Sequence, residues 1–588
     1  MKNPLDLPIK NKFLKYLIEK TTKLNGIKAI YQDWLDNSEN NHGTDGAGLL
    51  DFGLSHLDTK LAIHHGFNLK DIPSSGAIVF VANHPLGGLD GMLLAQMLLK
   101  IRPDLKVLTN EVLLAFPEFS ELFIGVDVLN LKKQKQNAKG ILKLSRHLAN
   151  NGAALIFPAG IVSKIKLKDF SIQEQPWNPM VARLIKKHRT DCMPIYIHSQ
   201  NRLAFYLSGH IHKRLRTALL GREMLAKKHT EIKITVGKII PFNELLQAKD
   251  PQALTEYLKL CCQCHCEKDK FNNNNSKELI EIKQNITHKN SKLQLNKLSP
   301  YLLLEYKSMA VYCAPYEKLG CMMEQISISR EQTFRAVDEG TGKELDSDIY
   351  DPFYWHLWVW DHDKNQIVGG YRLAKVDEII RKHGLSKLYS NSLYKYDTVF
   401  VKSLSHSVEV GRSFVTPQYQ RHPRALDLLW KGIGAYMLNN PNYHALFGCV
   451  SISRQYSNLA RALLADTLIH HYSVDKSLSK LVKPRIPLNL KNKPWSDKLL
   501  PSLAKIPIIN KLLGQIESGK TIPTLIRHYL ALNGKFITFS VNKSFNKSLD
   551  GLILVDLCEA PDKYLNRYLG KEGAIIFKNH WKKHESAA

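Results

Sequence analysis

The first half of the chain alternates short apolar runs with segments of helical periodicity. The apolar runs cover residues 77–82, 153–157, 193–197 and 232–236, and a helical pattern over Gly91–Ile101 follows the first of them. Short runs of this kind, separated by helices, are typical of buried strands in a central sheet. The pattern therefore predicts an α/β domain.

The second half shows the same alternation, although its sequence does not repeat that of the first. Apolar strand patterns lie at 356–360, 367–373, 407–415, 445–452 and 535–541. Helical patterns lie at 425–438 and 458–464. They predict a second domain of α/β or α+β class.

Between the halves the pattern breaks down. Residues 268–299 are rich in Lys, Asn, Gln and Ser and include the run Asn272–Asn275, so they hold too few apolar side chains to order themselves. We expect an N-terminal domain at 1–265, a low-complexity linker at 266–299 and a C-terminal domain at 300–588. The 588 residues suit such a division, because a single core stops growing well below that length.

The charge balance points to an acidic partner. Lys and Arg number 82 against 54 Asp and Glu, a formal net charge of +28, and nucleic acid, anionic lipid and an acidic carrier protein all qualify. No zinc-finger, RNA-recognition or helix-turn-helix signature supports nucleic acid. Without a secretory signal or a run of about 18 apolar residues, the protein is expected to be cytoplasmic. The segment Leu500–Ile516 is either a membrane-interface helix or a packed helix.

Four of the nine cysteines crowd together at Cys261, Cys262, Cys264 and Cys266, beside His265. A zinc site needs paired Cys-x-x-Cys spacing and a second pair, which this group lacks. The group is interpreted as a helix end that runs into the linker, and no metal site is expected.

The stretch Val81–Gly91 joins a predicted strand to a predicted helix, where open α/β sheets place their sites. A proline and two glycines separate His84 from Asp90, so the two side chains can fold back on each other, with Asn83 as a neighbouring substrate contact. A histidine held by a carboxylate has a fixed tautomer and serves as a base toward an alcohol. A lone histidine beside a turn is more often structural, so this assignment depends on a second motif.

That second motif is Phe157–Ser163, which follows another predicted strand. Its turn contains Phe157, Pro158, Gly160 and Ser163, and exposed backbone amides in such a turn suit a phosphate or a developing oxyanion. The two motifs together favour a catalytic site.

Both motifs resemble those of the glycerolipid O-acyltransferases, the lysophosphatidate acyltransferase superfamily, which carry His-x4-Asp and Phe-Pro-Glu-Gly-Thr-Arg-Ser. This chain has one more residue between His84 and Asp90, and has Ala, Ile and Val for Glu, Thr and Arg at positions 159, 161 and 162. In these departures it is similar to the hemolysin-like branch, over about Leu50–Phe242. The resemblance implies an acyl acceptor without a phosphate, because the missing Arg is the usual phosphate clamp.

Charged residues stand inside the apolar strand patterns of the second half, at Arg372, Glu409 and Arg412, where burial without a partner would be costly. They are either solvated strand residues with ordinary ion pairs or parts of a polar pocket. The same half also contains Arg330, Phe334, Asp346, Asp348 and Asp351. Carboxylates and arginines together suit an amino acid, whose ammonium and carboxylate need opposite partners.

As an ordered set these residues resemble the GNAT acyltransferases that use acyl carrier protein, a branch shared by autoinducer synthases and ornithine N-acyltransferases. Residues 446–452 and 522–550 are similar to the ornithine enzymes, and the resemblance covers about Met309–Asp556. Gln420–Ala425 lacks the Gly-rich turn with which a coenzyme-A-dependent member holds pyrophosphate. Acyl carrier protein is therefore the expected donor, coenzyme A is the less favoured one, and no other cofactor is expected.

The two halves together resemble the bifunctional ornithine-lipid acyltransferases, which have both domains on one chain in this order. The resemblance implies that the C-terminal domain transfers a 3-hydroxyacyl group to the α-amine of ornithine. The N-terminal domain then O-acylates the lyso-ornithine lipid, at the anionic inner face of the cytoplasmic membrane. The alternatives are an aminolipid of glycine, glutamine or lysine, and a non-catalytic, hemolysin-like membrane-binding protein.

The resemblance also implies a role for each residue. His84 would be the base and Asp90 its orienting partner, with the 157–163 turn as the acceptor and oxyanion platform. In the second half Glu409, directly or through water, would take the proton from the amine. Asp348 and Asp351 would bind the ammonium groups, and Arg330, Arg372 and Arg412 would shape the pocket. Phe334 would be a substrate contact in the same active-site region.

Overall fold

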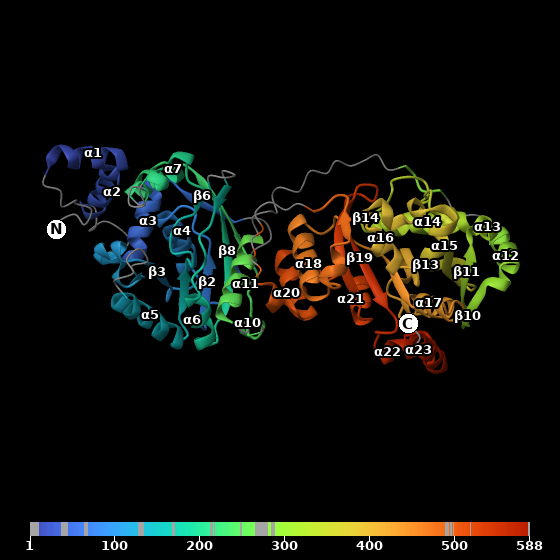
Figure 1. The fold of residues 1–588 in the computed structure, drawn as a ribbon. Helices are drawn as coiled ribbons and strands as arrows, with labels where there is room; N and C mark the ends of the chain where they lie inside the picture. The colour runs from blue at the N-terminus through green and yellow to red at the C-terminus, as the bar shows by residue number, and fades with distance from the viewer. Residues whose placement is uncertain are drawn as a thin grey trace. The chain divides into compact units, whose positions relative to one another are not determined.

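The chain forms two compact units in the computed structural model (Figure 1). Unit 1 comprises residues 1–270 together with 494–508, and unit 2 comprises 271–493 and 509–588. The structure describes residues 11–36, 45–63, 69–126, 134–166, 171–211, 216, 218–246, 248, 250–264, 280–283, 288–488, 493, 495, 497, 499–517 and 519–585.

Unit 1 is built on a seven-stranded sheet of order β1-β9-β8-β2-β5-β3-β4. Every neighbouring pair is parallel except β8 with β9. The strands are β1 (Lys60–Ile63), β2 (Ile78–Ala82), β3 (Lys106–Asn110), β4 (Phe123–Val126), β5 (Ala153–Ile156), β8 (Asp191–His198) and β9 (Glu231–Val236). The four predicted strands are confirmed as β2, β5, β8 and β9. A separate hairpin pairs β6 (Lys164–Lys166) with β7 (Ser171–Gln173).

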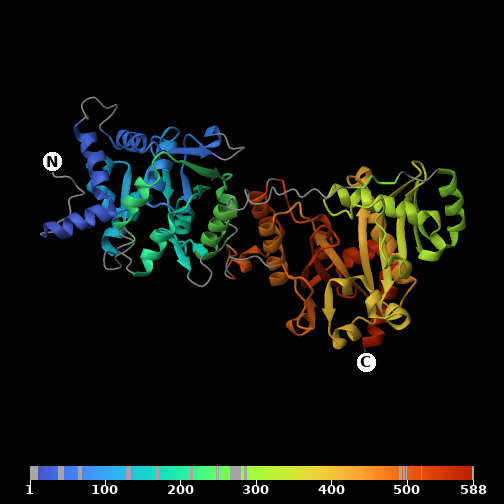
Figure 2. The same ribbon diagram turned by 90° about the horizontal axis from the view of Figure 1, so that it is seen from above.

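Helices pack on both faces of this sheet (Figure 2). The helices of unit 1 are α1 (Lys12–Thr22), α2 (Leu24–Asp36), α3 (Gly46–Leu57), α4 (Gly88–Leu99), α5 (Gln134–Ala149), α6 (Met180–His188), α7 (Leu203–Ile211), α9 (Leu220–Leu225), α10 (Phe242–Leu245) and α11 (Pro251–Gln263). The predicted helix 91–101 corresponds to α4. Phe80, Leu94 and Leu155 are fully buried in the core that the sheet shares with α4.

Unit 2 is built on an eight-stranded sheet of order β10-β11-β12-β13-β15-β16-β19-β18. The strands are β10 (Leu302–Tyr306), β11 (Met309–Pro315), β12 (Trp355–Asp361), β13 (Gln366–Lys375), β15 (Ser407–Val415), β16 (Ala445–Ile452), β18 (Lys535–Asn542) and β19 (Ser548–Asp556). A small sheet pairs β14 (Tyr394–Tyr396) with β17 (Val482–Pro484). The five predicted strands are confirmed as β12, β13, β15, β16 and β18.

Strands β15 and β16 are the one parallel pair of the large sheet in unit 2. Their register ends at Val410 and Gly448, although both strands continue. Beyond that point β15 is paired with β13 and β16 with β19. The two strands therefore separate in the middle of the sheet. They approach closely before they do so, since a Cβ at Gly448 would lie 2.0 Å from the Val410 carbonyl oxygen.

The helices of unit 2 include the two that the sequence predicts, α17 and α18. The set is α12 (His288–Lys297), α13 (Tyr316–Leu319), α14 (Cys321–Ala336), α15 (Val376–His383), α16 (Thr398–Ser403), α17 (Ala425–Leu438), α18 (Asn458–His471), α19 (Lys476–Ser479), α21 (Thr524–Ala531), α22 (Asp562–Tyr568) and α23 (Lys571–Glu585). Helix α20 (Ile506–Ile516) spans the boundary at which the two units are divided.

The segment predicted as a linker, 266–299, contains helix α12. Leu295 and Leu298 are buried there, in the same core cluster as Met322 and Ile326 of α14. These two leucines lie one helical turn apart and so share a face, a pattern that the polar composition of the segment as a whole conceals. Residues 265–279 and 284–287, which include His265, Cys266 and the asparagine run, lie outside the described residues.

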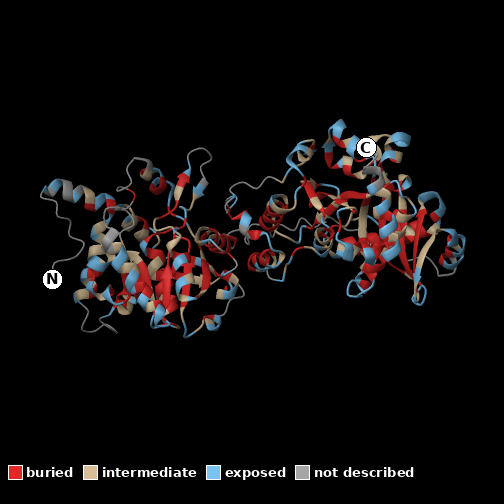
Figure 3. Ribbon diagram, turned by 60° about the horizontal axis from the view of Figure 1, so that its bottom comes forward, coloured by how far each residue is buried: buried red, intermediate tan, exposed pale blue. Residues whose placement is uncertain are grey.

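The segment 500–516 packs its apolar side chains inside the protein. Ile509, Leu512, Leu513 and Ile516 of α20 are buried, and Figure 3 shows buried residues concentrated along the strands and the inner sides of the helices. The packed-helix alternative is therefore confirmed for α20. Over the residues that the structure describes, no helix combines the length and the apolar character needed to cross a bilayer.

The described cysteines of the crowded group belong to the end of α11, as the sequence predicts. Cys261, Cys262 and Cys264 are buried, and the Cys262 thiol donates to the Ile195 carbonyl at 3.1 Å. Burial raises the pKa values of the Cys261 and Cys262 thiols well above the ordinary thiol value. Both thiols therefore stay protonated.

Candidate active sites

His84 and Asp90 meet at the turn between β2 and α4. His84 Nδ1 lies 3.1 Å from Asp90 Oδ2, and the backbone amides of Leu86 and Gly87 donate to the same carboxylate oxygen at 2.8 and 3.1 Å. Gly87 makes this turn possible with φ 81°, which a residue with a Cβ rarely adopts. Burial raises the pKa of Asp90, and the contacts with His84 and the two amides oppose that rise. The arrangement fixes the histidine ring and leaves its Nε2 for other partners.

The Phe157–Ser163 turn starts beside this pair. Its strand β5 is the parallel neighbour of β2, with Val81 opposite Ile156, and the Phe157 ring packs against the His84 ring with centroids 4.6 Å apart. The Gly160 amide donates to the Phe157 carbonyl at 2.9 Å. Pro158 accepts from the amide of Asn178 at 2.9 Å, and Ser163 is buried.

Asn83 is placed differently from its predicted role as a substrate contact. Its amide nitrogen donates to the Ile197 carbonyl at 3.1 Å, and its amide oxygen accepts from the Ile197 amide at 2.7 Å. The side chain therefore joins the end of β2 to β8. Its position next to His84 in the sequence gave no sign of this long-range pairing.

Glu174 belongs to the electrostatic surroundings of His84, and the sequence analysis did not single it out. Its carboxylate accepts a hydrogen bond of 2.9 Å from Gln263. Burial raises the pKa of Glu174, and contacts with Trp177 and the charge of Lys259 and His84 lower it. Glu174 directly follows the hairpin β6–β7 in the chain and belongs to neither of the two sequence motifs. The sequence therefore gave no reason to expect it near His84.

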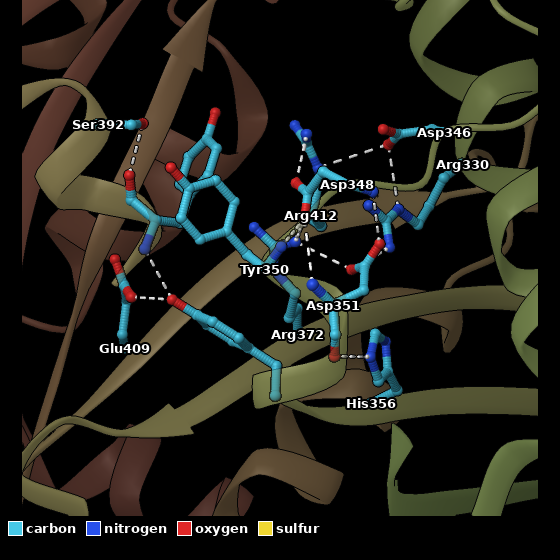
Figure 4. A network of polar contacts seen from close by, with 12 residues as sticks. Arg330, Asp346, Asp348, Tyr350, Asp351, His356, Arg372, Ser392, Glu409 and Arg412 are labelled. Atoms are coloured by element: carbon cyan, nitrogen blue, oxygen red, sulfur yellow. Dashed lines mark hydrogen bonds and ion pairs between the residues drawn. The ribbon is translucent and has the colours of Figure 1, made fainter. Parts of the chain in front are cut away.

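Unit 2 contains a cluster of three arginines and three aspartates (Figure 4). Its members are Arg330 of α14, Asp346, Asp348, Asp351, Arg372 of β13 and Arg412 of β15. The shorter contacts are Arg330 Nε–Asp346 Oδ2 and Arg330 Nη1–Asp351 Oδ1, 3.0 Å each, Arg372 Nη1–Asp348 Oδ1 2.6 Å, Arg372 Nη1–Asp351 Oδ1 2.9 Å and Arg412 Nη2–Asp348 Oδ2 2.9 Å. The three arginines are therefore largely buried and paired rather than solvated, and the polar pocket itself stays a prediction.

The pairing bears on the predicted ammonium-binding role of Asp348 and Asp351. Burial alone would raise the pKa of Asp351, but Arg330 and Arg372 lower it well below its ordinary range. Both carboxylates are already paired with guanidinium groups, so ammonium binding by these two residues stays a prediction. The cluster is thus a rigid, charge-balanced support. The Arg372 guanidinium also lies over the Tyr354 ring, 4.6 Å from its centroid.

Glu409 lies apart from this cluster (Figure 4). The Tyr354 hydroxyl donates to one of its carboxylate oxygens, and the Ser390 amide donates to the other at 2.8 Å. Tyr354 in turn accepts from the Tyr389 amide at 2.9 Å. The sequence analysis correctly expected Glu409 to be buried with partners, but its immediate partners are neutral.

Phe334 occupies a core position. It is buried and packs edge-on against Phe545, with ring centroids 4.9 Å apart, and against Phe414 at 6.4 Å. The Phe545 ring that it contacts lies in turn 4.9 Å, centroid to guanidinium, from Arg412. The predicted contact of Phe334 with substrate stays a prediction.

Glu339 is a buried carboxylate that the sequence analysis missed. It follows α14 and accepts a hydrogen bond of 3.0 Å from the Ser451 hydroxyl of β16. Ser451 is opposite Asp550 of β19, and Asp550 accepts hydrogen bonds from Asn542 and Ser548. Burial and the charge of Asp550 raise the pKa of Glu339 to about 8. A polar residue just past a helix end resembles a solvated position, so nothing local distinguished it.

One group of metal-ligand side chains occurs in the described part of the chain. His444, Asp556 and Cys558 lie within 4.8 Å of one another. His444 Nδ1 already contacts Asp556 at 3.0 Å, so the aspartate and histidine satisfy each other.

Comparisons with known proteins place each unit. An acyltransferase family matches residues 60–263, and the acetyltransferase (GNAT) domain family matches residues 329–431. The chain is 32% identical over 269 residues to a glycine N(alpha)-acyltransferase from Phocaeicola vulgatus, covering 42% of this chain and 80% of the relative. A similar enzyme from Bacteroides thetaiotaomicron is 30% identical over 42% of this chain and 77% of its own length. A lyso-glycine lipid O-acyltransferase from Phocaeicola vulgatus is 28% identical over 242 residues, 39% of this chain and 82% of the relative.

Proposed function

We propose that this protein acylates first an amino acid and then the product of that step. The chain belongs to the family of the glycine N(alpha)-acyltransferases. Unit 2 would join a 3-hydroxyacyl group to the α-amine, and unit 1 would esterify the 3-hydroxyl. The observation that carries this proposal is the presence of two acyltransferase domains on one chain, with a histidine–aspartate pair in the first.

In the O-acylation, His84 takes the proton from the acceptor hydroxyl as its oxygen attacks the thioester carbonyl. Asp90, 3.1 Å from His84 Nδ1, holds the tautomer that leaves Nε2 unprotonated and stabilises the imidazolium that forms. The proton then passes to the departing thiolate. Backbone amides of the 157–163 turn stabilise the oxyanion, which is the largest contribution in many acyl transfers.

In the N-acylation, the amine nitrogen attacks the thioester carbonyl carbon, a C–N bond forms and the carrier thiolate leaves. Glu409 is the proposed proton acceptor. Both of its oxygens accept hydrogen bonds from Tyr354 and Ser390, so the proton reaches it through the Tyr354 hydroxyl or a water. The arginine–aspartate cluster supports the floor of this site.

Ornithine is the proposed amino acid, on the resemblance of residues 446–452 and 522–550 to the ornithine enzymes. Glycine is the second candidate, because the similar relatives are named for glycine. The proposed acyl donor is acyl carrier protein, and the proposed site of action is an anionic membrane surface. The net charge of +28 supports both, since carrier proteins and such membranes are acidic.

The experiment supplies the full chain with 3-hydroxyacyl carrier protein for the amide, fatty acyl carrier protein for the ester and, separately, labelled ornithine and labelled glycine. The expected product is a doubly acylated amino acid from one of the two. The His84→Ala variant should accumulate the singly acylated lyso-lipid. A catalytically silent lipid-binding protein would give no labelled lipid with any amino acid, and labelled glycine lipid without ornithine lipid would assign the head group to glycine.

A further inference from the structure

Arg216 of unit 1 is a buried cation without an acidic partner in the described part of the chain. It is 8% exposed, and burial lowers the pKa of its guanidinium, with only Tyr206 acting in the opposite direction. A buried guanidinium of this kind is costly unless an anion joins it. Its aliphatic stem is fixed by close packing, since a Cβ at Gly209 would lie 2.9 Å from Arg216 Cδ.

Two sets of contacts link Arg216 to the turn that contains His84 and Asp90. The Arg216 carbonyl accepts from the Leu219 amide at 3.2 Å, and the next residue, Leu220, packs so closely on the turn that a Cβ at Gly87 would lie 2.8 Å from Leu220 Cδ2. Tyr206, whose pKa is raised mainly by burial, senses the charges of both Asp90 and Arg216. Arg216 is therefore within electrostatic reach of the residues around His84.

The same turn is tied to this region through Asn201. The Asn201 side chain donates to the Pro85 carbonyl at 3.1 Å, and the Asn201 amide donates to the Tyr206 hydroxyl at 3.1 Å. A second cation, Lys227, also has its pKa lowered by burial, and the charges of Glu223 and Asp90 oppose this. Arg216 and Lys227 are thus two cations of this region whose charged forms are disfavoured by burial.

We propose that Arg216 binds the free carboxylate of the acyl acceptor during O-acylation. The inference rests on the proposed function, in which amide formation consumes the α-amine and leaves the α-carboxylate intact. The acceptor therefore brings one carboxylate whether the amino acid is ornithine or glycine. A guanidinium can hold that group with two parallel hydrogen bonds, which would fix the acceptor while its 3-hydroxyl faces His84.

The test compares two acceptors that differ only at this group, Nα-(3-hydroxyacyl)ornithine and its α-carboxamide, with fatty acyl carrier protein as donor and the full chain as enzyme. Wild type should prefer the carboxylate by about 10- to 100-fold in kcat/KM, as expected for charge-assisted hydrogen bonds. Arg216→Gln should lose most of that preference through a raised KM for the carboxylate, while its activity on the carboxamide stays near that of wild type.

Two further variants separate this role from a structural one. Arg216→Lys keeps the charge without the planar fork and should retain part of the preference. Arg183→Gln, an exposed arginine of α6, should retain all of it. Equal use of the two acceptors by wild type, or an unchanged preference in Arg216→Gln, would overturn the inference. Failure of wild type to acylate either acceptor would instead count against the proposed function.

Discussion

Replacement of Glu339 by Gln should change how the stability of unit 2 depends on pH. The carboxyl is 5% exposed, and its pKa rises from an ordinary 4.5 to about 8 because of burial first and the charge of Asp550 second. Arg412 and the hydrogen bond from Ser451 lower it, and Asp338 adds to the rise. Gln keeps the shape and can still accept from Ser451, but it cannot ionise.

The direction and size follow from proton linkage. Below about pH 4.5 the group is protonated in both states. Between about 4.5 and 8 the unfolded chain releases the proton and the folded chain keeps it, so the free energy of unfolding falls as pH rises. Above about 8 the loss is complete. At about 1.4 kcal/mol for each pH unit, wild type should lose about 5 kcal/mol relative to Glu339→Gln over this interval.

The assay is urea unfolding of the full chain at several pH values between about 4 and 9. Because the chain has two units, hydrogen exchange of β16 and β19 amides reports on unit 2 alone. The variant should be the more stable protein at alkaline pH, with the gap closing toward acid. The exposed Glu317→Gln of α13 is the matched control. A constant gap between wild type and Glu339→Gln across the range would refute the reasoning.

Three other perturbations test the sites and the sheet. Asp90→Asn should slow O-acylation by about 10²- to 10⁴-fold while N-acylation in the same sample continues, so that lyso-lipid accumulates; equal loss of both activities would contradict the assignment. Glu409→Gln should abolish both products, and added lyso-lipid should restore the second; an undiminished yield of amide would exclude Glu409 as proton acceptor. Gly448→Ala would place its Cβ 2.0 Å from the Val410 carbonyl oxygen and should destabilise unit 2 by about 3 kcal/mol, measured by urea unfolding, whereas Gly411→Ala on the neighbouring strand enters open space and should cost about 1 kcal/mol or less.

Local patterns were sufficient where the structure depends on neighbours in sequence. The His84–Asp90 pair forms within one turn, and the proline and two glycines between these residues predict that turn. Central strands such as β2 and β5 are apolar runs because both of their faces are buried. Shorter strands with polar positions, such as β3 and β1, gave no such pattern.

Long-range placement could not be predicted in the same way. Asn83 stands next to His84 in the chain, yet its amide is satisfied by Ile197, more than a hundred residues away. Glu339 gains its environment only when α14 is brought against β16 and β19. The sequence indicates that a charged residue in an apolar strand, such as Arg372, needs a partner. Which carboxylate pairs with each arginine depends on the tertiary fold.

The division of the chain gives the first unit an unusual dependence on synthesis. Unit 1 includes residues 494–508 in addition to its N-terminal portion, and Leu499, Leu500 and Leu503 of that stretch are buried. Domains generally fold in order as they leave the ribosome, but here translation must pass residue 508 before the front acyltransferase has all its parts. A polypeptide ending in the 266–299 region would therefore lack a segment that belongs to unit 1.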